Sequence, residues 1–222
     1  MIWWPEQIPT LTSAAADKSL HVTLRPMELG DAEDIYRACQ DPEIPKFTTL
    51  PSEYSMDLAI SFAGERNIAS HANRTELVFV IEFTYSEKVY DTSADAVTSP
   101  DAVSSADAFT SAEINSESSK KFAGVISLHT IDIPNHRAEI GYWIAKEARG
   151  KGIGTISAEL ITEYGLMTMG FRRISGLVDV RNEASKKLLL NAGYEFEGNL
   201  KKYVTRRDGT QIDMALFAAT KN

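Results

Sequence analysis

A glycine-rich heptapeptide constrains the fold of this chain more than any other part of its sequence. Residues 149–155 read Arg-Gly-Lys-Gly-Ile-Gly-Thr, between a strand-like run at residues 138–145 and a helix-like run that begins near Gly152. Three alternating glycines keep the backbone free of side chains at this junction. Several N–H groups can therefore converge on one anion, and the helix N-terminus adds partial positive charge. The pattern predicts a binding loop for a phosphate or a pyrophosphate, to which Arg149 and Lys151 add charged side chains.

The spacing of these glycines excludes two common phosphate-binding motifs. A P-loop requires Gly, four residues and then Gly-Lys-Ser or Gly-Lys-Thr, and that string is absent from the sequence. The dinucleotide fingerprint requires G-x-G-x-x-G near the start of a βαβ unit, whereas this chain has G-x-G-x-G far from its N-terminus. The alternative to a phosphate site is a loop whose glycines only supply positive φ angles.

The string Arg-x-x-Gly-x-Gly at residues 149–154 resembles the acyl-CoA pyrophosphate loop of the GNAT N-acetyltransferases. Further segments resemble the family in the same order along the chain: Val-Thr-Leu-Arg-Pro at 22–26, Gly-Asp-Ala at 30–32, a strand at 173–180, Asn-Glu-Ala-Ser at 182–185 and Ala-Gly-Tyr-Glu-Phe-Glu-Gly at 192–198. The Glu-Ile-Gly-Tyr-Trp strand at 139–143 and the Asn-x-x-Ser helix start are most similar to the RimJ/RimL branch, which acetylates the N-termini of ribosomal proteins. The resemblance covers most of residues 21–219.

The resemblance implies an α+β fold, in which helices flank a central, mostly antiparallel mixed sheet of about seven strands. It also implies a V-shaped splay between the fourth and fifth strands. The residue patterns predict strands near 20–24, 77–84, 122–131, 137–145, 173–180, 194–204 and 211–218. They predict helices near 31–39, 56–68, 152–169 and 182–191, with Asp31 capping the first of them. A single domain is expected over residues 21–222, after an N-terminal extension over residues 1–20.

One segment interrupts this domain. A six-residue unit of the type Ser-Ala-Asp-Ala-Val-Thr repeats about four times over residues 93–116, and residues 91–119 hold six acidic residues and no basic one. Such a segment buries too little apolar surface to offset its ordering entropy, so we predict a flexible insertion at about 87–120, in the hairpin between the second and third strands. The alternative is a loop that docks a partner or gates the substrate.

Composition excludes several classes of function. A single cysteine, Cys39, rules out an intrachain disulfide, and the four scattered histidines lack metal-ligand spacing, so no metal is expected. The net charge of −8 argues against general nucleic-acid binding. No run is long and apolar enough to span a membrane, and the N-terminus lacks the pattern of a signal peptide. We therefore expect a cytoplasmic monomer or homodimer.

The reaction that the resemblance implies is the direct transfer of an acetyl group from acetyl-CoA to an amine. Glu139 is the first candidate for the general base; the alternative is a carboxylate that orients the substrate ammonium or pairs with an arginine. His136 is a second candidate, although a histidine in a Pro-Asn-His turn is usually a surface residue. The backbone N–H groups near Trp143 and Ile144 would polarise the thioester carbonyl.

The remaining cofactor contacts also follow from the resemblance. Asn182 would bind the cofactor or hold the splayed backbone, and Ser185 would reach the sulfur or the pantetheine; both residues also fit an ordinary helix start. Many family members carry a tyrosine seven residues after this asparagine to protonate the leaving thiolate, but this chain has Leu189 there. Ser185, another donor or solvent must then serve; Tyr194 is expected to be a packed aromatic. The residues expected to bind acetyl-CoA are Trp143, Ile144, Arg149, Gly150, Lys151, Gly152, Ile153, Gly154, Thr155, Asn182 and Ser185.

The acceptor is less constrained by the sequence. Phe47, Tyr142 and Trp143 are candidates for the walls of an amine pocket, and each could equally be a packing residue. The leading hypothesis is an N-acetyltransferase that acts on the α-amine of a protein or peptide, with a ribosomal protein as one candidate. Two alternatives are an acetyltransferase for a small amine, such as a polyamine or an aminoglycoside, and a non-catalytic regulator that binds acyl-CoA.

Overall fold

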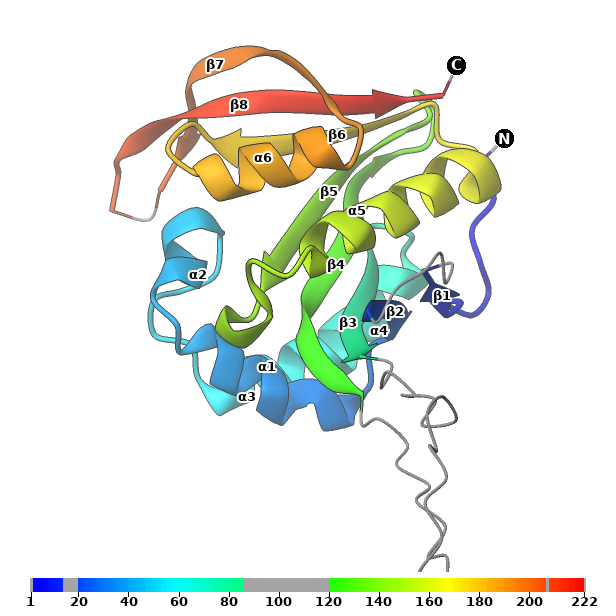
Figure 1. The fold of residues 1–222 in the computed structure, drawn as a ribbon, viewed down its shortest axis with the longest axis vertical. Coiled ribbons are helices and arrows are strands. Elements are labelled where there is room, and N and C mark those ends of the chain that lie inside the picture. Colours follow the sequence, from blue (N-terminus) through cyan, green and yellow to red (C-terminus); the bar gives the residue numbers. More distant parts are fainter. Residues whose placement is uncertain (1, 14–19, 86–119, 207, 222) are drawn as a thin grey trace, which may run out of the picture.

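The computed structural model describes residues 2–13, 20–85, 120–206 and 208–221. The predicted insertion lies outside the described residues, except for its last residue, Lys120. One mixed sheet of eight strands forms the centre of the molecule, in the order β1-β2-β3-β4-β5-β6-β8-β7 (Figure 1). The strands are β1 (Leu11–Thr12), β2 (Leu20–Pro26), β3 (Leu77–Tyr85), β4 (Lys121–Asp132), β5 (Arg137–Ile144), β6 (Arg173–Asp179), β7 (Glu195–Thr205) and β8 (Gln211–Thr220).

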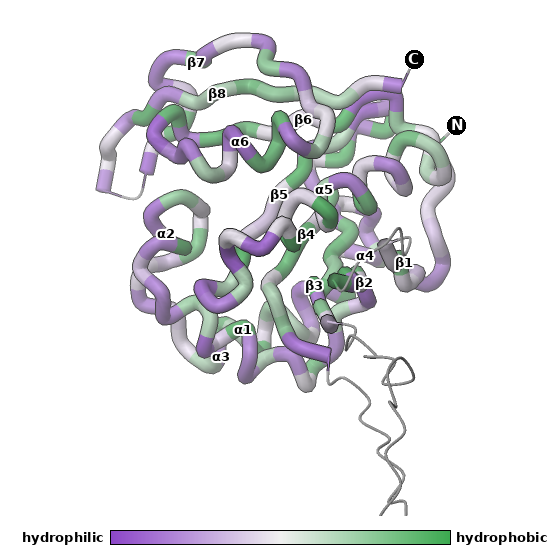
Figure 2. The backbone as a smooth tube through the Cα atoms, viewed as in Figure 1, coloured by the Kyte–Doolittle hydropathy of each residue, from purple (hydrophilic) through white to green (hydrophobic). Residues whose placement is uncertain are grey.

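The predicted α+β architecture is confirmed, with one strand more than expected. The additional strand is β1, a two-residue strand that pairs with β2 through Leu11↔Leu24 and Thr12↔Thr23. All neighbouring strands are antiparallel except β5 and β6. Apolar residues gather on β3 and β4, as Figure 2 shows, because both faces of these strands are covered by helices.

Helices occupy both faces of the sheet. They are α1 (Ala32–Cys39), α2 (Glu43–Phe47), α3 (Met56–Ser61), α4 (Asn67–Ala72), α5 (Ile153–Glu163) and α6 (Glu183–Asn191). On one face α5 packs over a core that includes Leu24, Phe79 and Leu128, while α1 and α3 pack over Val80 and Val125 on the other. Two π-helical segments extend these helices, Phe62–Arg66 after α3 and Tyr164–Met169 after α5, so the long predicted helices are confirmed in a segmented form.

The prediction that Asp31 caps α1 is wrong. The side chain of Asp31 makes no capping hydrogen bond to α1. Its carboxylate instead accepts hydrogen bonds from the Arg25 guanidinium at 2.6 and 2.9 Å and from the Glu28 backbone N–H at 2.7 Å. A guanidinium forms charge-assisted bonds with two carboxylate oxygens at once, and these are stronger than a bond to one neutral amide.

Candidate active site

The central strands β5 and β6 separate part-way along their length. They pair in parallel at three positions only, and the last of these is Glu139↔Ser175. Beyond this pair, β5 continues to Ile144 and β6 to Asp179, but no residue of one strand pairs with a residue of the other. The backbone groups along these facing edges are therefore available to an extended ligand, which can pair with them as an added strand would. This is the predicted splay between the fourth and fifth strands, since β1 shifts the numbering by one.

The glycine-rich loop lies in the segment that connects the end of β5 to the start of α5. Gly150 and Gly152 have φ angles of +74° and +81°, and a Cβ on either would meet no other atom within 4 Å. The first hydrogen bond of α5 runs from the Ile156 N–H to the Gly152 carbonyl at 3.1 Å, so the preceding N–H groups of α5 have no partner within the helix. An open cradle with unpaired donors at a helix N-terminus fits a pyrophosphate.

Gly154 has a second role in this loop. A Cβ at Gly154 would lie 2.6 Å from Leu188 Cδ1 and 3.3 Å from Ile144 Cγ1. The absent side chain therefore lets the first turn of α5 approach α6 closely, which brings the helix start toward the open strand edge.

Arg149 makes two contacts within the protein. Its Nε donates to the Ile144 carbonyl at 2.9 Å, and its Nη1 lies 2.7 Å from Asp41 Oδ2 in an ion pair. This ion pair lacks the alignment of a hydrogen bond, since Asp41 Oδ2 has no hydrogen-bond partner. Asp41 follows α1, so Arg149 links the loop to the segment between α1 and α2. A contact of Arg149 with a phosphate stays a prediction.

The start of α6 faces the open edge of β5. Asn182 caps this helix, because its side-chain oxygen accepts the Ser185 backbone N–H at 3.1 Å. The hydroxyl of Ser185 lies 2.7 Å from the hydroxyl of Tyr142, which reaches across from β5. Leu189 is fully buried one turn further along α6. The packed role expected of Tyr194 is confirmed, since its ring is buried and its hydroxyl lies 2.7 Å from Thr162 Oγ1.

The side chain of Glu139 lies on the face of β5 opposite to that of Tyr142. Ala138 and Ile140, its neighbours in the strand, belong to the core beneath α5, and side chains alternate between the two faces of a strand. The residue directly opposite Glu139 on β4 is His129. The His129 ring lies over Gly141, because a Cβ there would be 2.7 Å from His129 Nε2. A carboxylate and an imidazole, two groups that can accept a proton from an amine, thus share one face at the apex of the V.

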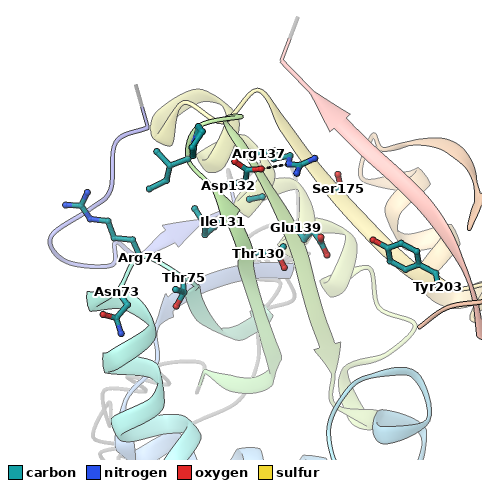
Figure 3. A pocket seen from close by; sticks show the side chains of 13 residues that line it. Asn73, Arg74, Thr75, Thr130, Ile131, Asp132, Arg137, Glu139, Ser175 and Tyr203 are labelled. Carbon is teal, nitrogen blue, oxygen red and sulfur yellow. Dashed lines mark hydrogen bonds and ion pairs between the residues drawn. The ribbon is translucent and has the colours of Figure 1, made fainter. Parts of the chain in front are cut away.

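A cavity of about 880 Å³ opens beside Glu139 (Figure 3). Its wall is formed by residues 73–75 after α4, residues 130–134 at the end of β4, the start of β5, Ser175 and Tyr203. Within the cavity, the negative charge of Asp132 is compensated, since its carboxylate accepts hydrogen bonds from Arg137 at 2.8 Å and from Asn135. The hydrogen bonds from Asn135, together with Arg137, hold the pKa of the Asp132 carboxyl below its usual range.

The residues predicted to wall the acceptor pocket do not line this cavity. Tyr142 and Trp143 point to opposite faces of β5, so they cannot wall one pocket on the same side. Trp143 packs against the Phe122 ring at 6.0 Å, and Phe47 lies in α2, where the Lys46 ammonium sits 4.9 Å from its ring centre. His136, the second base candidate, lies outside the cavity lining, with its Nδ1 3.3 Å from the Gly170 carbonyl oxygen.

His129 is the residue that sequence reasoning missed. A signal for it was present, because the predicted strands at 122–131 and 137–145 flank a short turn. Counting outward from the predicted strand ends at residues 131 and 137 pairs His129 with Glu139, which is the pair in the structure. The count is only approximate without the structure, since a bulge between His129 and Asp132 shifts the register by one residue.

Comparison with protein families gives a match to the acetyltransferase (GNAT) domain over residues 21–195. The chain belongs to the GNAT acetyltransferase family. It is therefore an acyltransferase.

Several curated N-acetyltransferases are similar to this GNAT chain. An uncharacterised N-acetyltransferase p20 of Bacillus licheniformis is 26% identical over 203 residues, which cover 90% of this chain and 93% of the relative. The putative ribosomal N-acetyltransferase YdaF of Bacillus subtilis is 40% identical over 90 residues, 40% of this chain and 46% of the relative. The spermidine N(1)-acetyltransferase of Escherichia coli K12 is 30% identical over 95 residues, 39% of this chain and 51% of the relative. The chain thus spans about half the length of the latter two relatives.

Solved structures share the fold of the GNAT chain at low sequence identity. Mycobacterium smegmatis RimJ in complex with CoA-disulfide has a TM-score of 0.71 and 20% identity, covering 98% of this chain and 90% of that one. The microcin C7 self-immunity acetyltransferase MccE, in complex with acetyl-CoA and AMP, has a TM-score of 0.67 and 24% identity, covering 92% and 93%.

No helix in the described part of the chain is long and apolar enough to cross a membrane. Among those same residues, no group of three or more His, Cys, Asp or Glu side chains could hold a metal ion.

Proposed function

We propose that this GNAT enzyme acetylates the N-terminal α-amine of a protein or peptide, with a ribosomal protein as one candidate acceptor. The observation that carries the proposal is the position of Glu139, which is the last residue of β5 that pairs with β6 and which lies in the wall of the cavity. Acetyl-CoA would lie along the free edge of β5, with its pyrophosphate at the loop before α5. The amine would arrive through the cavity.

Glu139 is the proposed general base. The attacking nitrogen forms a bond to the acetyl carbon, the carbon–sulfur bond breaks, and the excess proton on nitrogen passes to the Glu139 carboxylate directly or through water. The backbone N–H groups near Trp143 and Ile144 would stabilise the developing oxyanion. His129 lies opposite Glu139 and can orient the same proton transfer.

The charges around the cavity favour an acceptor with one amine. Asp132 is already compensated by Arg137, which leaves Glu139 as the carboxylate without an ion-pair partner among the lining residues. Arg74 also lines the cavity and makes no ion pair within the described chain. A polyamine brings several positive charges and needs several free carboxylates, whereas a peptide brings one α-amine and neutral or acidic groups behind it.

A polyamine acceptor is the second candidate. It is favoured by the similarity to the spermidine N(1)-acetyltransferase of Escherichia coli, which is 30% identical over 95 residues. The two candidates differ in a measurable way, because Arg74 would repel the several charges of a polyamine more strongly than the single α-ammonium of a peptide.

The test is release of free thiol from acetyl-CoA with a panel of N-terminal peptides and polyamines, using wild type, Glu139→Gln and the control Glu147→Gln. Glu147 is exposed and lies outside the cavity, so its loss is expected to be neutral. We expect turnover with peptides that falls about 100-fold or more in Glu139→Gln alone. Turnover with polyamines only would contradict a peptide acceptor and support a polyamine acceptor. Binding of acetyl-CoA without turnover would leave a non-catalytic binder or an untested acceptor.

A further inference from the structure

The imidazole of His129 lies over the open half of β5. A Cβ on Gly141 would be 2.7 Å from His129 Nε2 and 2.9 Å from His129 Cδ2, so the ring occupies the space that the glycine leaves free. Gly141 lies two residues beyond Glu139, the last residue of β5 that pairs with β6. Residues two apart on a strand share one face. The Nε2 edge of the ring therefore lies past the last strand pair, on the face that carries Glu139.

The other polar group near Gly141 is already engaged. Ser127 Oγ lies 3.6 Å from the same Cβ position, but its hydroxyl donates a hydrogen bond to Glu76 Oε1 at 2.9 Å. A neutral imidazole nitrogen also accepts a proton from an amine far more readily than a hydroxyl does. Of the side-chain atoms nearest to this position, His129 Nε2 is thus the one suited to take a proton.

Thr130 engages the second ring nitrogen. His129 Nδ1 lies 2.8 Å from Thr130 Oγ1, whereas His129 Nε2 makes no hydrogen bond to a described residue. A ring proton on Nδ1 is therefore satisfied by the hydroxyl, while a ring proton on Nε2 would have no such acceptor. In the Nδ1–H tautomer, Nε2 keeps a lone pair that can accept a proton.

The backbone of Thr130 is strained, which is an independent sign that its position matters. Its φ is +50°, in the left-handed region that β-branched residues rarely adopt. Thr130 lies in the bulge that shifts the β4–β5 register between His129 and Asp132. Bulges beside active sites re-aim a side chain, and strained residues gather where function needs a fixed geometry. Thr130 and Glu139 both line the cavity (Figure 3).

The distance along β5 gives His129 a role that Glu139 alone does not fill. The thioester carbonyl is expected at the backbone N–H groups near Trp143. A strand rises about 3.3 Å per residue, so Trp143 lies about 13 Å along β5 from Glu139. A glutamate side chain is shorter than that. His129 Nε2 lies over Gly141, midway between the two residues, and can pass a proton from one to the other.

We propose that His129 is a catalytic residue that carries the proton from the attacking amine to Glu139, and that Thr130 is a positioning residue that fixes the tautomer of His129. This rests on the acetyl transfer proposed above, with Glu139 as the final acceptor. As the amine nitrogen bonds to the acetyl carbon, one of its protons moves to His129 Nε2. The carbon–sulfur bond breaks with its electron pair on sulfur. The Nε2 proton then passes through water to Glu139, and solvent returns one proton to the thiolate as Glu139 releases one.

The direct experiment alkylates the enzyme with bromoacetyl-CoA, which carries a reactive carbon in place of the acetyl methyl. His129 Nε2 attacks this CH₂ carbon, the carbon–bromine bond breaks, bromide leaves and the Nδ1 proton goes to solvent. Trypsin then releases residues 122–137, a peptide that also contains His136, and fragmentation assigns the adduct. Cys39 does not compete, because it is buried and burial raises the pKa of its thiol to about 12. We expect the adduct on His129 and none on His136.

This labelling needs no acceptor amine, so it succeeds or fails independently of the proposed peptide acceptor, which thiol release tests. An adduct on Glu139 or on His136 overturns the proposal, as does the absence of an adduct in an enzyme that binds acetyl-CoA. Alkylation should be about three- to tenfold slower in Thr130→Val, which lacks the hydroxyl, than in Thr130→Ser, which keeps it. Both variants should unfold at the same temperature, because Thr130 is exposed. Equal alkylation rates in the two variants overturn the role of Thr130.

Kinetics with an active acceptor provide the second measurement. His129→Gln should lower kcat about 100-fold and change the KM for acetyl-CoA less than about twofold. Added imidazole should restore part of the activity of His129→Ala, since it can occupy the vacated space over Gly141. The control His21→Gln removes a histidine from β2, which β3 and β4 separate from β5, and should keep normal kcat. A kcat of His129→Gln within about twofold of wild type overturns the proposal.

Discussion

Substitution of Gly152 by glutamate tests the phosphate loop most sharply. Gly152 has φ +81° and ψ −9°, and a Cβ there would meet no atom within 4 Å. A residue with a side chain costs about 1–2 kcal/mol in this left-handed conformation. The folded protein therefore accepts Gly152→Glu with a fall in Tm of about 2–8 °C, since each kcal/mol shifts Tm by about 2–4 °C at this size.

The effect on acetyl-CoA binding should be much larger. A carboxylate about 5 Å from a phosphate charge costs about 3 kcal/mol at an effective dielectric constant of about 20. Gly152 is exposed, so we take half of that value for each of two phosphate charges. The resulting loss of about 3 kcal/mol raises the Kd by more than about 100-fold, before any steric effect.

The control is Gly193→Glu, measured by calorimetric titration with acetyl-CoA and by thermal unfolding. Gly193 follows α6 with φ +84° and also has no atom within 4 Å of its Cβ position, so it imposes the same backbone strain away from the loop. We expect similar Tm values for the two variants and near-normal affinity in Gly193→Glu only. An acetyl-CoA Kd within about threefold of wild type in Gly152→Glu would refute the phosphate site.

Two predictions concern stability. Leu189→Ala should lower the free energy of unfolding by about 2–5 kcal/mol, because Leu189 is fully buried. The control Leu190→Ala should lower it by less than about 1 kcal/mol, because that side chain is 53% exposed. Equal urea midpoints for the two variants would contradict the packed role of Leu189. Asp179 is buried, and hydrogen bonds from Arg181, with the charge of Arg206, lower its pKa. Its ion-pair stabilisation is present above the unfolded-state pKa of about 3.9 and is lost as pH falls through the lower folded-state value. Asp179→Asn should therefore cost about 3 kcal/mol at pH 6, and the difference from wild type should narrow below about pH 4. A constant difference from pH 6 to pH 3, measured by urea unfolding, would contradict the assignment.

Much of the fold was predictable from local pattern. The seven predicted strands and the helices around them are present, because apolar periodicity and glycine positions reflect local backbone preferences. The error at Asp31 has a tertiary cause, since Arg25 on β2 offers its carboxylate a stronger partner than the helix does. The short strand β1 could not be predicted, because a two-residue strand carries no periodic signal.

The candidate site divides in the same way. The sequence by itself determined the glycine-rich turn before α5, the cap formed by Asn182 and the absence of a hydroxyl at Leu189, because each depends on residue type at a fixed local spacing. Only the tertiary structure decided which side chains meet. Strand register places His129 opposite Glu139, and the strand pleat sends Tyr142 and Trp143 to opposite faces.

The Tyr142–Ser185 contact joins residues 43 positions apart, and it forms because β5 and β6 separate beyond Glu139. That separation depends on which strands pair and where pairing stops. Both are set by the packing of α5 and α6 over the sheet, a property of the whole chain that no local stretch of sequence contains.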